Sequence, residues 1–385
     1  MAQRTLAGVV GVVVMGIAGG GTGSAAFGQL QLSGEQFVTA DGAPIVVPGY
    51  SVPSLADWNN DGLLDLIIGE GGDGITPLVR VYLNVGTASD PQFSGFFYAQ
   101  TQSGDLTVPT LGCLGIFPRV VQWDGDGRKD LLAGLADGTV QVFLNINTDA
   151  DPLFDDGTFL EVGLPGSKVN IDIGARATPI AVDWNLDGRK DLVVGGVDGR
   201  IHVFLNEGTD TAPDFRAQTY AQAHGAELFL VGGRSSPVFM DFDGDGKRDL
   251  LSGDTTGELV FYANTGTDAA PSFGDFELVR SLGVVITLPD YERTRPFVGD
   301  WDNDGQFDVI VGYGDGKVRH YRDLQGLCDF DSDRDVDVND YAAFEGCLGG
   351  PDVPIGGCSL GPDLDEDGDI DLHDVALFQI LFTGE

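Results

Sequence analysis

The chain has 385 residues, of which 42% are hydrophobic, enough for one large domain with a packed core and a small second domain. Its 60 Asp and Glu residues outnumber its 21 Lys and Arg residues, and the formal net charge at pH 7 is -39. This charge argues against a nucleic acid as partner, because a phosphate backbone attracts Lys and Arg. Many of the acids stand in short motifs at fixed spacing, which a merely solubilising surface does not require.

The first 26 residues have the layout of a cleaved secretory signal. Arg4 precedes an apolar run from Leu6 to Ala18, and small residues follow up to Ser24-Ala25-Ala26. The run is short for a membrane span, and no later apolar segment reaches membrane length. We therefore predict a signal peptide over residues 1–26, a secreted protein that is extracellular or at the cell surface, and no direct insertion into a membrane.

A nine-residue pattern then occurs five times, at intervals of about sixty residues. The copies are residues 57–65, 122–130, 183–191, 241–249 and 300–308, of which the fourth reads DFDGDGKRD. In the second copy Gln122 replaces the first carboxylate, which weakens that site.

This spacing fits calcium, which takes six to eight oxygens from side chains at positions one, three, five and nine and from the carbonyl at position seven. Glycine at position six allows the sharp turn around an ion. The loops hold no Cys or His, which argues against zinc and copper. The predicted ligands are Asp57, Asn59, Asp61, Leu63 and Asp65; Asp124, Asp126, Arg128 and Asp130; Asp183, Asn185, Asp187, Arg189 and Asp191; Asp241, Asp243, Asp245, Lys247 and Asp249; and Asp300, Asp302, Asp304, Gln306 and Asp308.

The alternative is that each loop is a tight hairpin whose Asp and Asn side chains only cap backbone groups. Five copies in register favour the metal. Around each loop the sequence is typical of short strands with a glycine-containing turn, and an Asn-x-Gly/Asn-Thr segment with a downstream Pro-x-Phe follows in four copies. Short strands at this period predict a β-propeller.

The fifth copy stops after its third strand, at residues 318–322. The N-terminal residues 27–50 parallel residues 273–295, so they can supply the missing outer strand and close the ring, which removes exposed edges. We predict a mainly β fold, a five-bladed propeller over residues 27–323.

At these loops the chain resembles the FG-GAP and VCBS repeats of integrin α-subunit heads and of many secreted bacterial proteins, over roughly residues 30–323. The resemblance implies calcium in loops along one side of the blades. The repeat count departs from the pattern, since the integrin-like heads have seven repeats.

Two twelve-residue acidic loops follow, each with a helical segment after it, predicted at residues 341–347 and 375–382. Their predicted ligands are Asp329, Asp331, Asp333, Asp335, Asp337 and Asp340, then Asp363, Asp365, Asp367, Asp369, Asp371 and Asp374. Residues 328–385 thereby resemble a type I dockerin, a small α-helical EF-hand-like module, which implies a cohesin-like partner. Arg334 stands where the sharp turn normally has glycine, and the alternative is a purely structural calcium clip.

Four cysteines in an exported chain favour disulfides. Spacing favours Cys347 with Cys358, because the two flank a short Gly-Pro-rich connector. Cys113 and Cys328 either pair or stay free.

We therefore predict a binding protein and not an enzyme. A propeller stiffened by up to about seven calcium ions presents a surface to an extracellular glycan or protein, and the tail attaches it to a partner. The alternative is a secreted polysaccharide-degrading lyase or glycosidase, but nearly every conspicuous Asp is assigned to a metal loop, and no nucleophile motif is present.

Overall fold

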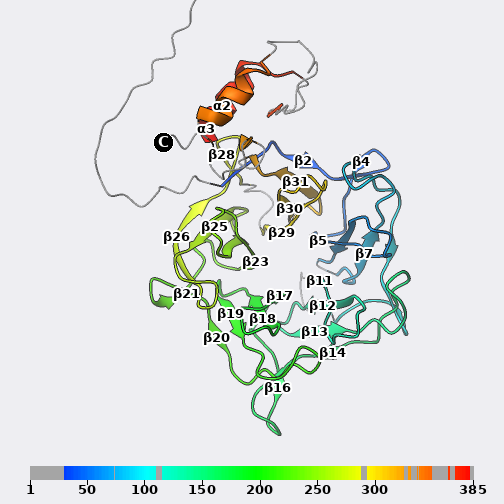
Figure 1. The fold of residues 1–385 in the computed structure, drawn as a ribbon. Coiled ribbons are helices and arrows are strands. Elements are labelled where there is room, and N and C mark those ends of the chain that lie inside the picture. The colour runs from blue at the N-terminus through cyan, green and yellow to red at the C-terminus, as the bar shows by residue number, and fades with distance from the viewer. Residues whose placement is uncertain are drawn as a thin grey trace, which may run out of the picture.

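The computed structural model describes residues 30–72, 74–109, 115–287, 293–324, 328–330, 336, 338–348, 363–364 and 369–381. The expected signal peptide lies outside these residues. Strands arranged around a centre form a β-propeller, with two short helices beside it (Figure 1). Within the described ranges, the helices are too short to cross a membrane.

Each of the five acidic repeats builds one antiparallel sheet whose innermost strand immediately precedes the loop. We call these the repeat sheets, first to fifth. In order from the centre outward, their strands are β5 (Val52–Ala56), β6 (Asp65–Gly69), β7 (Val79–Tyr82) and β8 (Phe97–Tyr98); β11 (Phe117–Val121), β12 (Asp130–Gly134), β13 (Val140–Phe143) and β14 (Thr158–Phe159); β17 (Thr178–Val182), β18 (Asp191–Gly195), β19 (Ile201–Phe204) and β20 (Thr219–Tyr220); β23 (Ser236–Met240), β24 (Asp249–Gly253), β25 (Leu259–Asn264) and β26 (Ser272–Leu278); and β29 (Arg295–Gly299), β30 (Asp308–Gly312), β31 (Val318–Arg322) and β2 (Gln36–Phe37).

Short hairpins follow the outer strands and reach toward the neighbouring sheet. They are β3 (Thr39–Ala40) with β4 (Ala43–Pro44), β9 (Gln100–Thr101) with β10 (Gly104–Asp105), β15 (Glu161–Val162) with β16 (Val169–Asn170), β21 (Gln222–Ala223) with β22 (Ala226–Glu227), and β27 (Arg280–Ser281) with β28 (Val284–Val285). Parallel bridges join Ala40 to Phe93, Thr101 to Phe154 and Val162 to Phe215. The hairpins therefore tie each repeat sheet to the next.

The prediction of five blades is wrong as a count of sheets. Among the described residues, six sheets have three or more strands: the five repeat sheets and a smaller one formed by β1 (Gln31–Leu32) with β27 and β28. The sixth sheet arises because the N-terminal segment makes two pairings, β1 in parallel with β27 and β2 antiparallel with β31. The sequence parallel between the two ends of the domain indicated only an outer strand.

The repeat sheets close into a ring. The innermost strands β5, β11, β17, β23 and β29 contact one another in that order, and β29 also contacts β5. Five buried apolar clusters lie between neighbouring sheets, and one of them joins Ile310 and Val318 of the fifth sheet to Leu66 and Ile68 of the first. The core is thus a series of interfaces between faces of sheets, which explains why one repeat could not bury its faces alone.

The C-terminal part contains helices α2 (Val338–Glu345) and α3 (Leu372–Leu381), which begin three residues earlier than predicted. For α3 the reason is an N-cap: Asp371 Oδ1 accepts a hydrogen bond from the His373 N–H at 2.7 Å. The rings of Phe344 and Phe378 stack between the helices, with centroids 4.9 Å apart. Leu282, at the tip of the β27–β28 hairpin, packs against this helical cluster and so links it to the propeller.

Candidate functional site

The carboxylate at position nine of each loop is part of the sheet framework. Asp65, Asp130, Asp191, Asp249 and Asp308 are at most 3% exposed. One oxygen of each accepts the backbone N–H of the position-two aromatic residue, at 2.6 to 3.0 Å. In the first four loops the other oxygen accepts the N–H of the Asn that begins the Asn-x-Gly/Asn-Thr segment. These hydrogen bonds hold each loop to its sheet.

Burial has a clear electrostatic effect at this position. It raises the pKa of Asp65 to about 6 and that of Asp249 to about 7, despite the backbone hydrogen bonds, because the charged carboxylate loses its solvation. An approaching cation or proton stabilises a buried carboxylate of this kind, because it neutralises the negative charge.

Two positions in each loop have left-handed backbone. At position six, Gly62, Gly127, Gly188, Gly246 and Gly305 have φ between 85° and 90°, which explains the invariant glycine. Position four is also left-handed, with φ between 55° and 75° at Asn60, Gly125, Leu186, Gly244 and Asn303. Four of these five residues are Asn or Gly, the types that adopt this conformation most readily, and only Leu186 is costly there.

Part of the alternative, capping by side chains, is also present in the loops. Asp57 accepts hydrogen bonds from the N–H groups of Asp61 and Gly62 at 3.0 and 2.9 Å, and Asp183 and Asp300 do the same in their loops. These bonds preform the turn, but they leave further lone pairs on the carboxylates for a cation.

In the fourth and fifth loops, three carboxylates lie close together. Asp241, Asp243 and Asp249 each place a carboxylate oxygen within 4.8 Å of the others, and Asp300, Asp302 and Asp304 do so in the fifth loop. Asp241 Oδ1, Asp243 Oδ2 and Asp302 Oδ1 are buried without a hydrogen-bond partner. Burial and the neighbouring carboxylates raise the pKa of Asp243 and of Asp302. All-oxygen donors of this kind, with buried lone pairs left over, fit calcium.

The first three loops differ from these two. They are described in full, and in none of them do three acidic side chains meet within the same distance. In the second, third and fourth loops the cation at position seven forms an ion pair with the carboxylate at position five: Arg128 with Asp126, Arg189 with Asp187, and Lys247 with Asp245. The five motifs therefore differ in two separate respects. Three carboxylates meet only in the fourth and fifth of these loops, whereas the ion pair at position seven is present in the second, third and fourth.

The aromatic residues at position two of the loops pack between neighbouring sheets. Trp58 lies against Phe154 of the second sheet, with ring centroids 5.7 Å apart, and Trp301 lies against Phe93 of the first at 5.6 Å. Each of these Phe residues ends a Pro-x-Phe element. The two recurring motifs of the sequence therefore meet across sheet boundaries.

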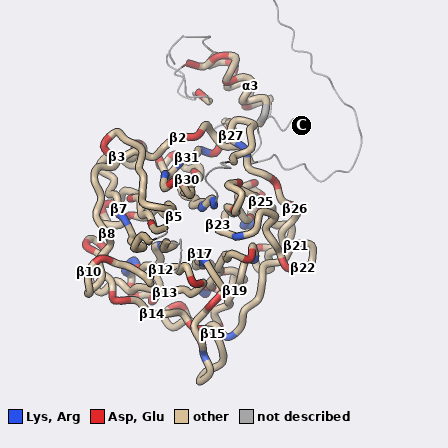
Figure 2. The backbone as a smooth tube through the Cα atoms, turned by 180° about the vertical axis from the view of Figure 1, so that it is seen from behind, with Lys and Arg blue, Asp and Glu red and all other residues tan. Residues whose placement is uncertain are grey.

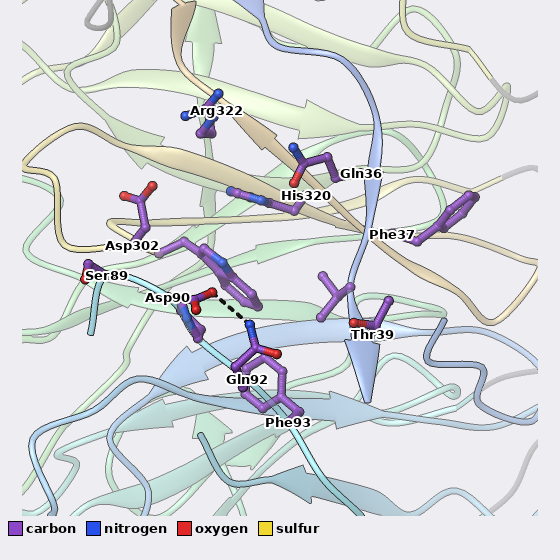
Figure 3. A pocket seen from close by; sticks show the side chains of 13 residues that line it. Gln36, Phe37, Thr39, Ser89, Asp90, Gln92, Phe93, Asp302, His320 and Arg322 are labelled. Carbon is purple, nitrogen blue, oxygen red and sulfur yellow. Dashed lines mark hydrogen bonds between the residues drawn. The ribbon is translucent and has the colours of Figure 1, made fainter. Parts of the chain in front are cut away.

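A groove of about 380 Å³ lies where the two ends of the propeller meet. It is lined by β2, by residues 89–93 of the first repeat and by Trp301, Asp302, His320 and Arg322 of the fifth (Figure 3). The Trp301 and His320 rings are stacked at 5.2 Å, and His320 Nε2 lies 2.9 Å from Asp308 Oδ1. The sequence analysis missed this groove because its walls are nearly 300 residues apart in the chain.

In the tail, the described parts of the two loops correspond to each other. The position-twelve carboxylates Asp340 and Asp374 are fully buried, and each accepts the N–H of position two, from Phe330 at 2.6 Å and Leu364 at 2.7 Å. Asp369, Asp371 and Asp374 bring carboxylate oxygens within 4.8 Å of one another. The other described ligand candidates are Asp329 and Asp363, whereas Asp331, Asp333, Asp335, Asp337, Asp365 and Asp367 lie outside the described residues, as does Arg334.

The cysteines are placed only in part. Cys328 is a free thiol, fully buried in the helical cluster, and burial raises its pKa. Cys347 is disulfide-bonded, while its expected partner Cys358 and also Cys113 lie outside the described residues. The pairing of Cys347 with Cys358 stays a prediction.

Comparison with known proteins supports the repeat assignment. Residues 183–252 and 241–311 match the model of the FG-GAP-like repeat, which covers the third, fourth and fifth loops. Among curated proteins, none matches the chain.

Among solved structures, a GH43_1 enzyme from Xanthomonas citri is 14% identical, with 74% of this chain and 90% of that chain covered and a TM-score of 0.42. An Agrocybe aegerita lectin that recognises non-reducing terminal N-acetylglucosamine is 18% identical, with 71% and 65% covered and a TM-score of 0.32. The Photorhabdus luminescens Tc holotoxin pore is 15% identical with a TM-score of 0.33; 75% of this chain is covered, which spans 12% of that one. Likenesses this distant carry no statement about function. What is established is a mainly β propeller that carries FG-GAP-like repeats.

Proposed function

We propose that this is a secreted, calcium-stiffened binding protein, whose propeller presents a surface to an extracellular glycan or protein. The observation that carries the proposal is the fourth and fifth loops, where three carboxylates meet and buried oxygens lack partners. Bound calcium would neutralise carboxylates that otherwise repel one another and would hold loop and sheet together.

The test is calcium stoichiometry on the mature protein, with thermal unfolding before and after chelation. The fourth and fifth loops should bind first, and calcium at one hundred times its Kd should stabilise the fold by about 2.7 kcal/mol per site. Asp243→Asn should abolish one tight ion. Asp126→Asn, in the second loop, is the matched control and should leave the tight ions unchanged. Absence of bound calcium, or equal effects of the two variants, would contradict the metal assignment.

The groove between the first and fifth repeat sheets is the proposed ligand surface of the propeller. Its walls carry hydrogen-bonding side chains, among them Gln36, Asp90, Gln92 and Arg322, beside the rings of Phe93 and His320 (Figure 3). Such a mixture of amide, charged and aromatic groups suits a hydroxyl-rich ligand. Calcium-saturated protein should bind members of a polysaccharide panel, and Gln92→Ala should weaken that binding at unchanged melting temperature.

The tail is proposed to attach the protein to a cohesin-like module. Support comes from the matching hydrogen bonds of Asp340 and Asp374 and from the carboxylate cluster of the second loop. Full-length protein should bind purified cohesin-like modules in calcium but not in chelator, and Asp374→Asn should abolish the binding. If every module fails to bind in calcium while chelation still destabilises the tail, the structural clip is the correct function.

A further inference from the structure

Four arginines gather at the amino ends of the innermost strands. Arg176 and Arg234 precede β17 and β23 by two residues, Arg293 precedes β29 in the same way, and Arg295 begins β29. All four line one cavity, which we call the arginine cavity. Seen from behind, acidic positions are spread around the ring while basic positions also occur near its centre (Figure 2). In a chain of net charge -39, such a cluster of like charges needs a cause.

The guanidinium groups of Arg293 and Arg295 lie over the Tyr50 ring, 4.5 and 4.8 Å from its centroid, but the backbone at three of the four positions does not favour a side chain. Arg176, Arg234 and Arg293 have φ of 60°, 49° and 84°, a strained conformation for any residue but glycine. Each stands three positions before the proline of its innermost strand, and Gly115 occupies that place in the second repeat. A side chain is therefore kept where glycine would be less strained, which is typical of a functional position.

Arg295 Nη1 donates to the Arg293 carbonyl at 2.9 Å, but several other donors in the arginine cavity have no protein acceptor. Arg234 Nη1, Arg293 Nε and Nη1, and the Ser236 hydroxyl are buried without a hydrogen-bond partner. Ser236 is 4% exposed and lines the same cavity. Among the described residues, no ion pair joins Arg234, Arg293 or Arg295 to a carboxylate.

The single described acid in the cavity wall, Asp254, already accepts hydrogen bonds from neighbouring residues. Asp254 accepts hydrogen bonds from the N–H groups of Thr256 and Glu258 through Oδ1, and the Thr256 hydroxyl contacts both of its oxygens. Burial, together with the charges of Arg293 and Arg176, lowers the pKa of Arg295 to about 9. An anion at this point would relieve the repulsion among the guanidinium groups.

The size of the cavity limits the ligand. It has about 30 Å³ of space, enough for two or three water molecules at roughly 10–15 Å³ each, so a single oxyanion group fits and a sugar ring does not. We propose that the arginine cavity binds one oxyanion group, a carboxylate or a sulfate, carried by an acidic polysaccharide or free in solution. The glycan source rests on the proposed binding function, whereas the anion site itself does not.

The site is separate from the metal loops. The loops begin where the innermost strands end, and the arginines lie where the same strands begin, so a five-residue strand of about 16 Å separates the two. Calcium and the anion therefore act on opposite faces of the ring, and each can be tested without the other.

The test is calorimetric titration of the full-length, calcium-saturated protein at constant ionic strength, with sodium sulfate, polygalacturonate and neutral dextran as probes. The oxyanion probes should bind, and Arg234→Gly with Arg293→Gly should weaken binding at least about tenfold per arginine removed, which corresponds to about 1.4 kcal/mol each. Glycine suits the backbone at both positions, which offsets the loss of the Arg293 contact with the Tyr50 ring, so the melting temperature should change little. Arg216→Gln, an exposed arginine paired with Asp214 and Glu207, is the matched control.

The outcomes separate the sources and the two proposals. Polygalacturonate binding that sulfate displaces supports a glycan carboxylate; binding of sulfate alone, lost in the double variant, supports a free oxyanion. Equal affinity of the double variant and the control overturns the site, even if a neutral glycan still binds elsewhere. Failure of both oxyanions to bind the wild-type protein overturns it as well, whatever the calcium stoichiometry shows.

Discussion

At the scale of single residues, the metal loops are preorganised by backbone conformation before any ion arrives. Position four is left-handed in all five loops, a requirement that sequence spacing did not reveal because Asn and Gly there look like ordinary loop residues. Leu186 is the exception, because leucine adopts the left-handed conformation only at a cost in free energy. Its side chain is 53% exposed, so it contributes little packing in return.

We expect Leu186→Asn to stabilise the protein by about 1 kcal/mol, because Asn tolerates this conformation better than Leu. Chemical denaturation of the calcium-free protein measures the change. Val197→Asn, also exposed and with ordinary backbone, should stay within about 0.5 kcal/mol. A destabilised Leu186→Asn protein would show that the leucine makes a contact of greater value than its conformational cost.

His202 gives a second prediction at this scale. Burial lowers its pKa although Asp198 lies beside it, so the folded state keeps the ring neutral where the unfolded chain takes up a proton. Stability should therefore be retained above about pH 6.5 and fall as the pH drops below that value. In His202→Gln, which copies Gln141 of the second repeat, thermal melts at pH 7 and pH 5 should differ less than in the wild type. Equal pH dependence of the two proteins would disprove the role of His202.

At the scale of elements, the strands, turns and loops could be predicted from the sequence, because each repeat contains its own pattern for them. The strand after each loop begins at the position-nine Asp, and the glycine turn and the Pro-x-Phe segment fall where the pattern placed them. Contacts between repeats were not readable. The groove between the first and fifth repeat sheets and the arginine cluster depend on side chains that meet across sheets, whereas the ion pairs at position seven lie within single loops.

The packing of position two against Pro-x-Phe also belongs to this scale. Phe154 is 1% exposed and lies between the first and second sheets. Phe154→Ala should cost about 3–5 kcal/mol, because it leaves a cavity at a sheet boundary, and denaturant unfolding should report the loss. The control is Val85→Ala, at an exposed residue of the corresponding segment in the first repeat, which should cost less than about 0.5 kcal/mol.

At the scale of the whole molecule, the N-terminal segment holds the ring shut. β2 pairs with β31, and Arg319 donates to Glu35 at 3.0 Å. A chain that begins at Thr39 should melt at a lower temperature and self-associate, since β31 would become an open edge. A chain that begins at Leu30 keeps both β1 and β2 and should match the mature protein in melting temperature and in size-exclusion volume. Identical behaviour of the two shortened chains would show that closure does not depend on these strands.

The closing contacts also dictate an order of events during synthesis. Glu35 emerges from the ribosome early, and Arg319, 284 residues later, is made only when the last repeat appears. The partner of β1 is complete at residue 281, but β2 has no partner until β31 has been made. Closure of the ring is therefore the last and most non-local step of folding, and a chain arrested before residue 322 presents an open edge to chaperones or to another copy.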